Sequence, residues 1–195
     1  MIEFIEKIDV DFLLWINGNH SEFWDNIMWF ASGKLTWLPF YIALLSLLIW
    51  KYKKDAILMI LLIALLITMS DQLASGIFKP LFERLRPSHN PDLINKLHFV
   101  NDYRGGKFGF ISSHAANVFS LAIYLSKLTY ERIKWLPFIL LPWAVFVSIS
   151  RVYLGVHYPT DIIVPAILSI PLALIIARIY KKYNPVLTNF FKDVQ

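Results

Sequence analysis

The chain has 195 residues, of which 57% are hydrophobic and 17% are charged. Soluble domains average about 45–50% apolar and about 25% charged residues, so this balance is typical of an integral membrane protein. The net charge of +5 does not indicate a nucleic-acid partner, because the basic residues cluster at the ends of apolar runs, where membrane topology explains them. The chain has no cysteine, which excludes a disulfide framework and a thiolate metal site.

The N-terminal region, residues 1–33, mixes Trp, Phe and Leu with Asp, Asn, His and Glu. It is too polar to span a bilayer, and we predict amphipathic helices that lie in the membrane interface. A soluble helical cap is the alternative interpretation. The first residues are acidic and lack a basic segment with a cleavage site, so no signal peptide is expected.

Five apolar stretches follow, at residues 35–50, 56–78, 110–129, 133–150 and 160–180. A helix needs about 20 apolar residues to cross the bilayer core, and lipid forces backbone groups to pair within the segment. The predicted fold is therefore all-α: an integral membrane helical bundle of about five transmembrane helices. We expect a single domain over 1–195, with the bundle in 34–183 and a cytoplasmic tail in 184–195.

Basic clusters set the expected orientation. They occur at residues 51–54, 127–134 and 178–183, which helix parity places on one side of the membrane. The positive-inside rule makes that side cytoplasmic. The opposite, extracytoplasmic side then holds residues 79–109 and 151–159.

Ionisable residues gather at the outer ends of the predicted spans, in "KPLFERLRP", "FISSHAAN" and "SRVYLGVHYPTD". Singly, each has an ordinary explanation: snorkelling cations, a serine N-cap, or an interfacial His–Asp pair. Together, cations and helix N-terminal amides are what a phosphate group needs, and paired histidines can attack phosphorus and protonate a leaving oxygen. Two histidines and an aspartate could also ligate a metal, but the surrounding cations would repel one, so neither metal nor cofactor is predicted.

These segments resemble the motifs of the type 2 phosphatidic acid phosphatase superfamily. "KPLFERLRP" matches its KxxxxxxRP motif, "SRVYLGVHYPTD" matches SRxxxxxHxxxD, and "ISSH" takes the place of PSGH. The resemblance implies a metal-independent phosphatase with a phosphohistidine intermediate. It implies His157 as the nucleophile, Asp161 as its partner and His114 as the general acid. The phosphate-binding residues that it implies are Lys79, Arg86, Ser112, Ser113 and Arg151.

The middle motif departs from the family pattern. Ile111 replaces its proline and Ser113 replaces its glycine. Serine can present its amide to phosphate if its backbone is helical, whereas a positive φ would be costly. A weakened enzyme, or a lipid-binding or transport protein without turnover, therefore remains an alternative. A vanadate-dependent haloperoxidase is disfavoured, because the five apolar stretches do not suit a soluble protein.

Phosphate on a lipid lies at the headgroup level, where the outer ends of helices meet it. We therefore expect a lipid phosphatase of the bacterial cytoplasmic membrane that acts on its extracytoplasmic face. The candidate substrates are those that the resemblance implies: undecaprenyl diphosphate is the first, and the alternatives are phosphatidylglycerol phosphate, phosphatidic acid and lipid A phosphates. The lipid substrate and the bilayer are the expected partners, and the sequence specifies no oligomeric state.

For the remaining polar residues we expect mainly structural roles. Glu83 and Arg84 are expected to form a local surface or interface pair. The loop 88–108 is expected to shape substrate access, with Tyr103 and Phe108 touching a lipid tail or packing the loop. Asp71 is assigned a structural role within the bundle, with tuning of Lys79 as the alternative. The residues expected to be solvated in the loop are His89, His98, Asp102 and Arg104.

Overall fold

The structure, a computed structural model, describes residues 2–193, with side chains from residue 4 to residue 185. This part of the chain is helical and contains no β-strand, which confirms the all-α prediction. The helices are α1 (Ile2–Gly18), α2 (Glu22–Ser32), α3 (Leu38–Tyr52), α4 (Asp55–Asp71), the π-helix η1 (Gln72–Phe78), α5 (Lys79–Phe82), the 3-10 turns η2 (Pro87–His89) and η3 (Val100–Asp102), α6 (Ser113–Thr129), α7 (Pro137–Tyr153) and α8 (Pro159–Asp193).

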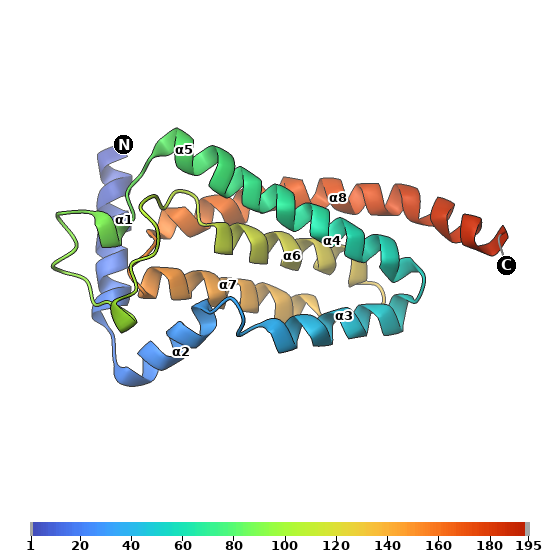
Figure 1. The fold of residues 1–195 in the computed structure, drawn as a ribbon, viewed down its shortest axis with the longest axis horizontal. Coiled ribbons are helices and arrows are strands. Elements are labelled where there is room, and N and C mark those ends of the chain that lie inside the picture. The colour runs from blue at the N-terminus through green and yellow to red at the C-terminus, as the bar shows by residue number, and fades with distance from the viewer. Residues whose placement is uncertain (1, 194–195) are drawn as a thin grey trace.

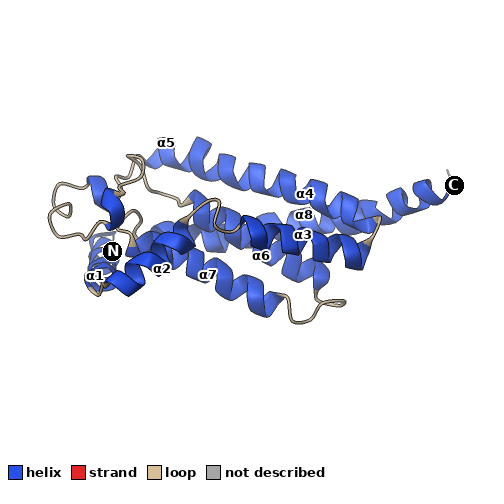
Figure 2. Ribbon diagram, turned by 60° about the horizontal axis from the view of Figure 1, so that its bottom comes forward, coloured by secondary structure: helices blue, strands red, loops and turns tan. Residues whose placement is uncertain are grey.

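The molecule is an elongated bundle with α6 at its centre (Figures 1 and 2). Helix α6 packs against α4, α7 and α8. Small buried residues allow this close approach: the Ser120 hydroxyl lies 3.3 Å from that of Ser70 on α4 and 3.1 Å from that of Ser169 on α8. The bundle core is therefore tied together by small and hydroxyl side chains as well as by apolar packing.

Within the described residues, two continuous helical stretches are long and apolar enough to cross a membrane, Asp55–Phe82 and Pro159–Pro185. Only 28% of the apolar window of each is buried inside the protein, so most of these side chains face outward, as lipid contact requires. Helices α3 and α7 are apolar but shorter, with 15 and 17 residues. All five predicted apolar stretches form helices, while the count of five membrane crossings stays a prediction.

Two of the predicted spans end later in the structure than the sequence indicated. The second predicted span, 56–78, continues through η1 and α5 without a break, so Lys79 stands on the same helical stretch as Asp71. The fifth, 160–180, extends as α8 to Asp193 and takes in most of the predicted tail; residues 194–195 lie outside the described residues.

The basic clusters lie at the end of the bundle away from α1 (Figure 1). The turn between α3 and α4 and the connection between α6 and α7 meet there: Arg132 Nη1 donates to the Lys51 carbonyl at 3.4 Å. The Tyr180 hydroxyl of α8 donates to the Asp55 carbonyl at 3.4 Å at the same end. The three clusters therefore lie at one end of the bundle, as helix parity predicts, and the cytoplasmic side of that end stays a prediction.

Helices α1 and α2 cover the opposite end, together with the long loop 83–112 (Figure 1). On α1 the buried residues Asp9, Leu13 and Asn17 recur every four positions and form one inward face. The other face exposes large apolar side chains, namely Phe4, Ile5, Ile8, Phe12 and Trp15. This amphipathic pattern agrees with the expected helices, and their place in the membrane interface stays a prediction.

Candidate active site

Residues of α4, η1, α5, α6, α7 and the turn before α8 line a cavity of about 520 Å³ at the end of the bundle that α1 and α2 cover. Of the predicted catalytic and phosphate-binding residues, those that line the cavity are Lys79, Arg86, Ser113, His114, Arg151 and His157. The loop and helix ends add Lys34, Asp71, Tyr103 and Asn117. Residues 78 positions apart in the chain thus share one site, as the motif order implied.

His157 lies in the turn between α7 and α8, and only 1% of it is exposed. Its Nδ1 is 3.2 Å from Oδ2 of Asp161, which is four residues later in the first turn of α8. The Asp161 carboxylate also accepts hydrogen bonds from the Tyr158 amide at 3.1 Å and from Arg84 Nη1 at 3.1 Å. These three contacts fix the position of the Asp161 carboxylate. The carboxylate keeps the His157 proton on Nδ1, so the His157 Nε2 carries the free lone pair.

The surroundings of His157 keep its imidazole neutral. Burial lowers the pKa of His157 well below its ordinary value of 6.5, and the nearby cations Arg86 and Arg151 lower it further. A neutral imidazole is the form that can act as a nucleophile. The same cations attract an anionic phosphate. One cluster of positive charges therefore both keeps His157 neutral and binds the substrate.

Two buried arginines flank the cavity. Arg151, at the end of α7, is 2% exposed; its Nη1 donates to the Ser32 hydroxyl and its Nη2 donates to the Tyr103 hydroxyl at 3.0 Å. Arg86 Nε donates to the Phe108 carbonyl at 3.1 Å, and burial lowers the pKa of its guanidinium. Protein contacts therefore fix both guanidinium groups before any substrate arrives, which reduces the cost of ordering them.

Lys79 is the third cation of the motifs that lines the cavity. Its Nζ donates to the Ser113 hydroxyl at 2.9 Å and to the Ser75 hydroxyl at 3.3 Å, one turn back on the same helix. Asp71 lines the same cavity, which agrees with the alternative in which it influences Lys79. These neutral partners leave the ammonium charge available to an anion.

The middle motif lies at the start of α6. Ser112 is its N-cap: its side chain is fully buried and accepts a hydrogen bond from the Ala115 amide at 3.4 Å. Ser113, in contrast, lines the cavity and begins the helix. Of the two serines that the resemblance implies, the structure therefore turns Ser113 toward the cavity and Ser112 toward its own helix.

The two departures from the family pattern are accommodated locally. In the described chain, the non-glycine residues with positive φ are Lys53, Glu83, Asn101 and Asp102, so Ser113 has no positive φ. Ile111 is 2% exposed and packs with Ala74 and Ala116 between α6 and η1. The serine thus keeps an ordinary helical backbone, and the isoleucine contributes to the core.

The sequence interpretation of Arg84 was wrong. Arg84 makes no ion pair with Glu83 in the described chain. Its Nη2 is 2.7 Å from Asp9 Oδ2 on α1, while its Nη1 contacts Asp161 and the Thr160 hydroxyl. Asp9 also accepts the Thr160 amide hydrogen bond at 2.9 Å. This network joins the N-terminal helix to the carboxylate behind His157.

Other residues also differ from their expected roles. Ser32 and Tyr103 hold Arg151, so Tyr103 does more than pack the loop. His98 is not a free loop residue, because it pairs with Asp25. The partners come from distant parts of the chain, and no sequence spacing relates them to the motifs.

Replacing Asp9 with asparagine is expected to weaken the network from α1 to Asp161. The loss of one charged hydrogen-bond partner should cost about 2 kcal/mol of unfolding free energy. A loosened Asp161 should lower kcat by about tenfold. Chemical denaturation and phosphate release measure the two effects. Asp11→Asn, on the exposed side of the same helix, is the control; equal values for the two variants would contradict the network's role.

At Gly109 the loop 83–112 passes close to the catalytic pair. A Cβ at this position would lie 2.9 Å from Asp161 Oδ2 and 3.1 Å from Arg86 Cγ, whereas a Cβ at Gly106 would meet nothing within 4 Å. Gly109→Ala should therefore displace Asp161 or Arg86 and lower kcat by about tenfold to a hundredfold. Gly106→Ala should retain activity; a comparable loss in both variants would show that the effect is not local.

The comparisons with known proteins agree with this geometry. The family model described as the PAP2 superfamily matches residues 56–185, which include all the motif residues. The chain therefore belongs to the PAP2 superfamily, and it is a lipid phosphatase of the membrane type, which confirms the resemblance seen in the sequence.

Two curated relatives are similar over most of the chain. A lipid A 4'-phosphatase of Bacteroides thetaiotaomicron is 44% identical over 172 residues, which are 87% of this chain and 75% of the relative. A lipid A 4'-phosphatase of Porphyromonas gingivalis is 38% identical over 184 residues, 93% of this chain and 75% of the relative.

A solved structure shows the same fold. The crystal structure of a transmembrane PAP2-type phosphatidylglycerolphosphate phosphatase from Bacillus subtilis matches with a TM-score of 0.68 and 23% identity. The match covers 91% of this chain and 87% of that one. At this identity the likeness shows the fold alone.

Proposed function

We propose that this protein removes a phosphate group from lipid A. The cavity supplies the chemistry of a phosphatase, and the observation that selects the substrate is the similarity to two lipid A 4'-phosphatases over 87% and 93% of the chain. The site would lie on the extracytoplasmic side of a bacterial cytoplasmic membrane, where the basic clusters at the other end of the bundle would place it.

The proposed reaction begins with His157. Its Nε2 attacks phosphorus, the bond from phosphorus to the lipid oxygen breaks, and His114 donates a proton to that oxygen. Lys79, Arg86 and Arg151 balance the charge on the equatorial oxygens. Water then attacks the phosphohistidine, with His114 taking a proton from it, and the bond from phosphorus to Nε2 breaks to release inorganic phosphate.

The positions of the residues support these roles. Nδ1 of His157 is engaged by Asp161, so Nε2 is the nitrogen left for attack. His114 lines the cavity. Its imidazole makes no side-chain hydrogen bond to another described residue. The cations come from three separate helix or loop ends, which suits a phosphoryl group that must be held from several directions.

Undecaprenyl diphosphate is the second candidate substrate. Lys34, after α2, also lines the cavity and adds a fourth cation to the three in the motifs. A second phosphate group could use this charge, and a diphosphate would place it next to the first.

The substrate can be tested with the purified, full-length protein in detergent and chelator. Doubly phosphorylated lipid A, undecaprenyl diphosphate, phosphatidylglycerol phosphate and phosphatidic acid would be offered separately, with mass spectrometry of each lipid product. We expect loss of one phosphate from lipid A, and the fragment masses identify its position. Turnover of undecaprenyl diphosphate with lipid A left intact would reverse the order of the two candidates.

A further inference from the structure

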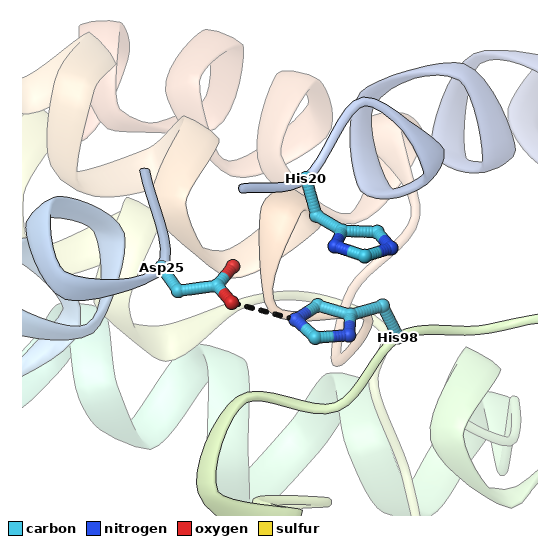
Figure 3. Close-up of side chains that lie close together, drawn as sticks. All are labelled: His20, Asp25 and His98. Atoms are coloured by element: carbon cyan, nitrogen blue, oxygen red, sulfur yellow. Dashed lines mark hydrogen bonds and ion pairs between the residues drawn. The ribbon is translucent and has the colours of Figure 1, made fainter. Parts of the chain in front are cut away.

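A second group of polar side chains lies outside the catalytic cavity, where α1 ends and α2 begins. His20, Asp25 and His98 each offer a ligand atom, and these atoms all lie within 4.8 Å of one another. Figure 3 shows the two imidazoles face to face, with the Asp25 carboxylate at one edge. The ring centroids are 3.8 Å apart and the planes differ by 8°. None of the three residues lines the catalytic cavity.

Two of the three residues are held in place by neighbouring groups. Asn17, which is 1% exposed, donates to the His98 carbonyl at 2.9 Å and accepts from the His98 amide at 2.8 Å. The Tyr153 hydroxyl donates to Asp25 Oδ1 at 2.6 Å, which leaves Oδ2 facing His98 Nε2 at 2.8 Å. A hydrogen-bonded carboxylate and a histidine fixed through its backbone are the kind of support that metal ligands have in proteins.

From this arrangement we propose that His20, Asp25 and His98 bind a divalent transition-metal ion, with Zn²⁺ as the best match. Imidazole nitrogen suits zinc, copper and nickel, whereas magnesium and calcium prefer oxygen ligands alone. Two histidines and one carboxylate are a known donor set for zinc, with water as the fourth ligand. His20 is exposed, so the ion can enter from solvent.

The present distances require only local adjustment. Zinc ligands lie about 2.0–2.2 Å from the ion, so ligand atoms in a tetrahedral site are about 3.3 Å apart. The pair of His98 Nε2 and Asp25 Oδ2, now at 2.8 Å, would separate slightly to admit the ion. The His20 ring would turn toward the same point, which its exposed position permits.

The bound ion would tether the outer loop to the N-terminal helices. His20 and Asp25 belong to the α1–α2 region, while His98 lies in the loop five residues before Tyr103, which holds Arg151. Asp25 is also bonded to Tyr153 at the end of α7, two residues after Arg151. The ion would stabilise the covering of the active site, and the phosphoryl-transfer chemistry would not depend on it.

The test uses full-length protein without a histidine tag, dialysed against chelator in detergent. Zn²⁺ binding is measured by calorimetry, and Co²⁺ is added separately to detect tetrahedral coordination by its visible absorption. We expect one site per chain and a Kd at least about tenfold weaker in His20→Gln and in His98→Gln, because each loses one of three protein ligands. His89→Gln, a loop histidine outside the cluster, should bind as the parent does.

His20→Gln is the decisive variant, because His20 is exposed and its replacement should leave the fold intact. Zn²⁺ should also raise the unfolding temperature of the parent but not that of His20→Gln. The proposal is overturned if the parent binds no Zn²⁺ at micromolar concentrations, or if His20→Gln binds it as tightly as the parent. In either case His98 and Asp25 form an ion pair only. Lipid turnover is not the readout, so the result is independent of the proposed function.

Discussion

Replacing His157 with alanine is expected to lower chelator-resistant phosphate release from lipid by about four orders of magnitude or more. The variant loses the nitrogen that the proposed reaction uses to attack phosphorus. The remaining cations can still bind phosphate, so substrate affinity should change much less than kcat. Steady-state phosphate release and equilibrium binding of inorganic phosphate separate the two quantities.

The His157→Ala variant should still fold. Asp161 keeps its hydrogen bonds from Arg84 and from the Tyr158 amide when the imidazole is removed. The matched control is His89→Ala, which removes a histidine from the loop 83–112 at the same end of the bundle but not from the cavity. Near-parental activity in a folded His157→Ala protein would show that another group attacks phosphorus.

His114→Ala should have the second-largest effect, a loss of about 10²- to 10⁴-fold in kcat on lipid phosphate. A lipid alkoxide is a poor leaving group and needs a proton as its bond to phosphorus breaks. An aryl phosphate such as p-nitrophenyl phosphate leaves without that help. The loss should therefore be much smaller on the aryl substrate, provided that formation of the phosphohistidine limits the rate.

This dependence on the leaving group distinguishes an acid from a structural residue. If His114 only shaped the cavity, the variant would lose the same factor on both substrates. Asn117 lies one turn further along α6 and lines the same cavity, so Asn117→Ala is the matched control. We expect that variant to lose activity equally on the two substrates, if it loses any.

The fold was largely predictable because a lipid environment restricts which secondary structures an apolar stretch can form. Apolar stretches must become helices when no water is available to pair their backbone, and all five did. The lengths were less predictable: the second span was expected to end at residue 78, yet the helical stretch continues to Phe82, and the polar residues Asp71, Gln72 and Ser75 lie within it. They are tolerated because Asp71 and Ser75 face the cavity rather than lipid.

The candidate site was predictable where a motif fixes the spacing. The interval of four residues from His157 to Asp161 puts the carboxylate beside Nδ1 whenever a helix begins between them. Asp9, Ser32 and Tyr103 follow no such rule. They reach Arg84 and Arg151 across 75, 119 and 48 positions, and only the packing of α1, α2 and the loop brings them there.

The central claim is that His157 carries the phosphoryl group during lipid hydrolysis. The most direct measurement is a single turnover of lipid labelled with radioactive phosphate, in chelator, quenched in alkali and mapped by peptide mass spectrometry. We predict an alkali-stable, acid-labile label on His157 that is absent from His157→Ala. A complete turnover in which the quenched protein never carries label, or carries it on another residue, would contradict the account.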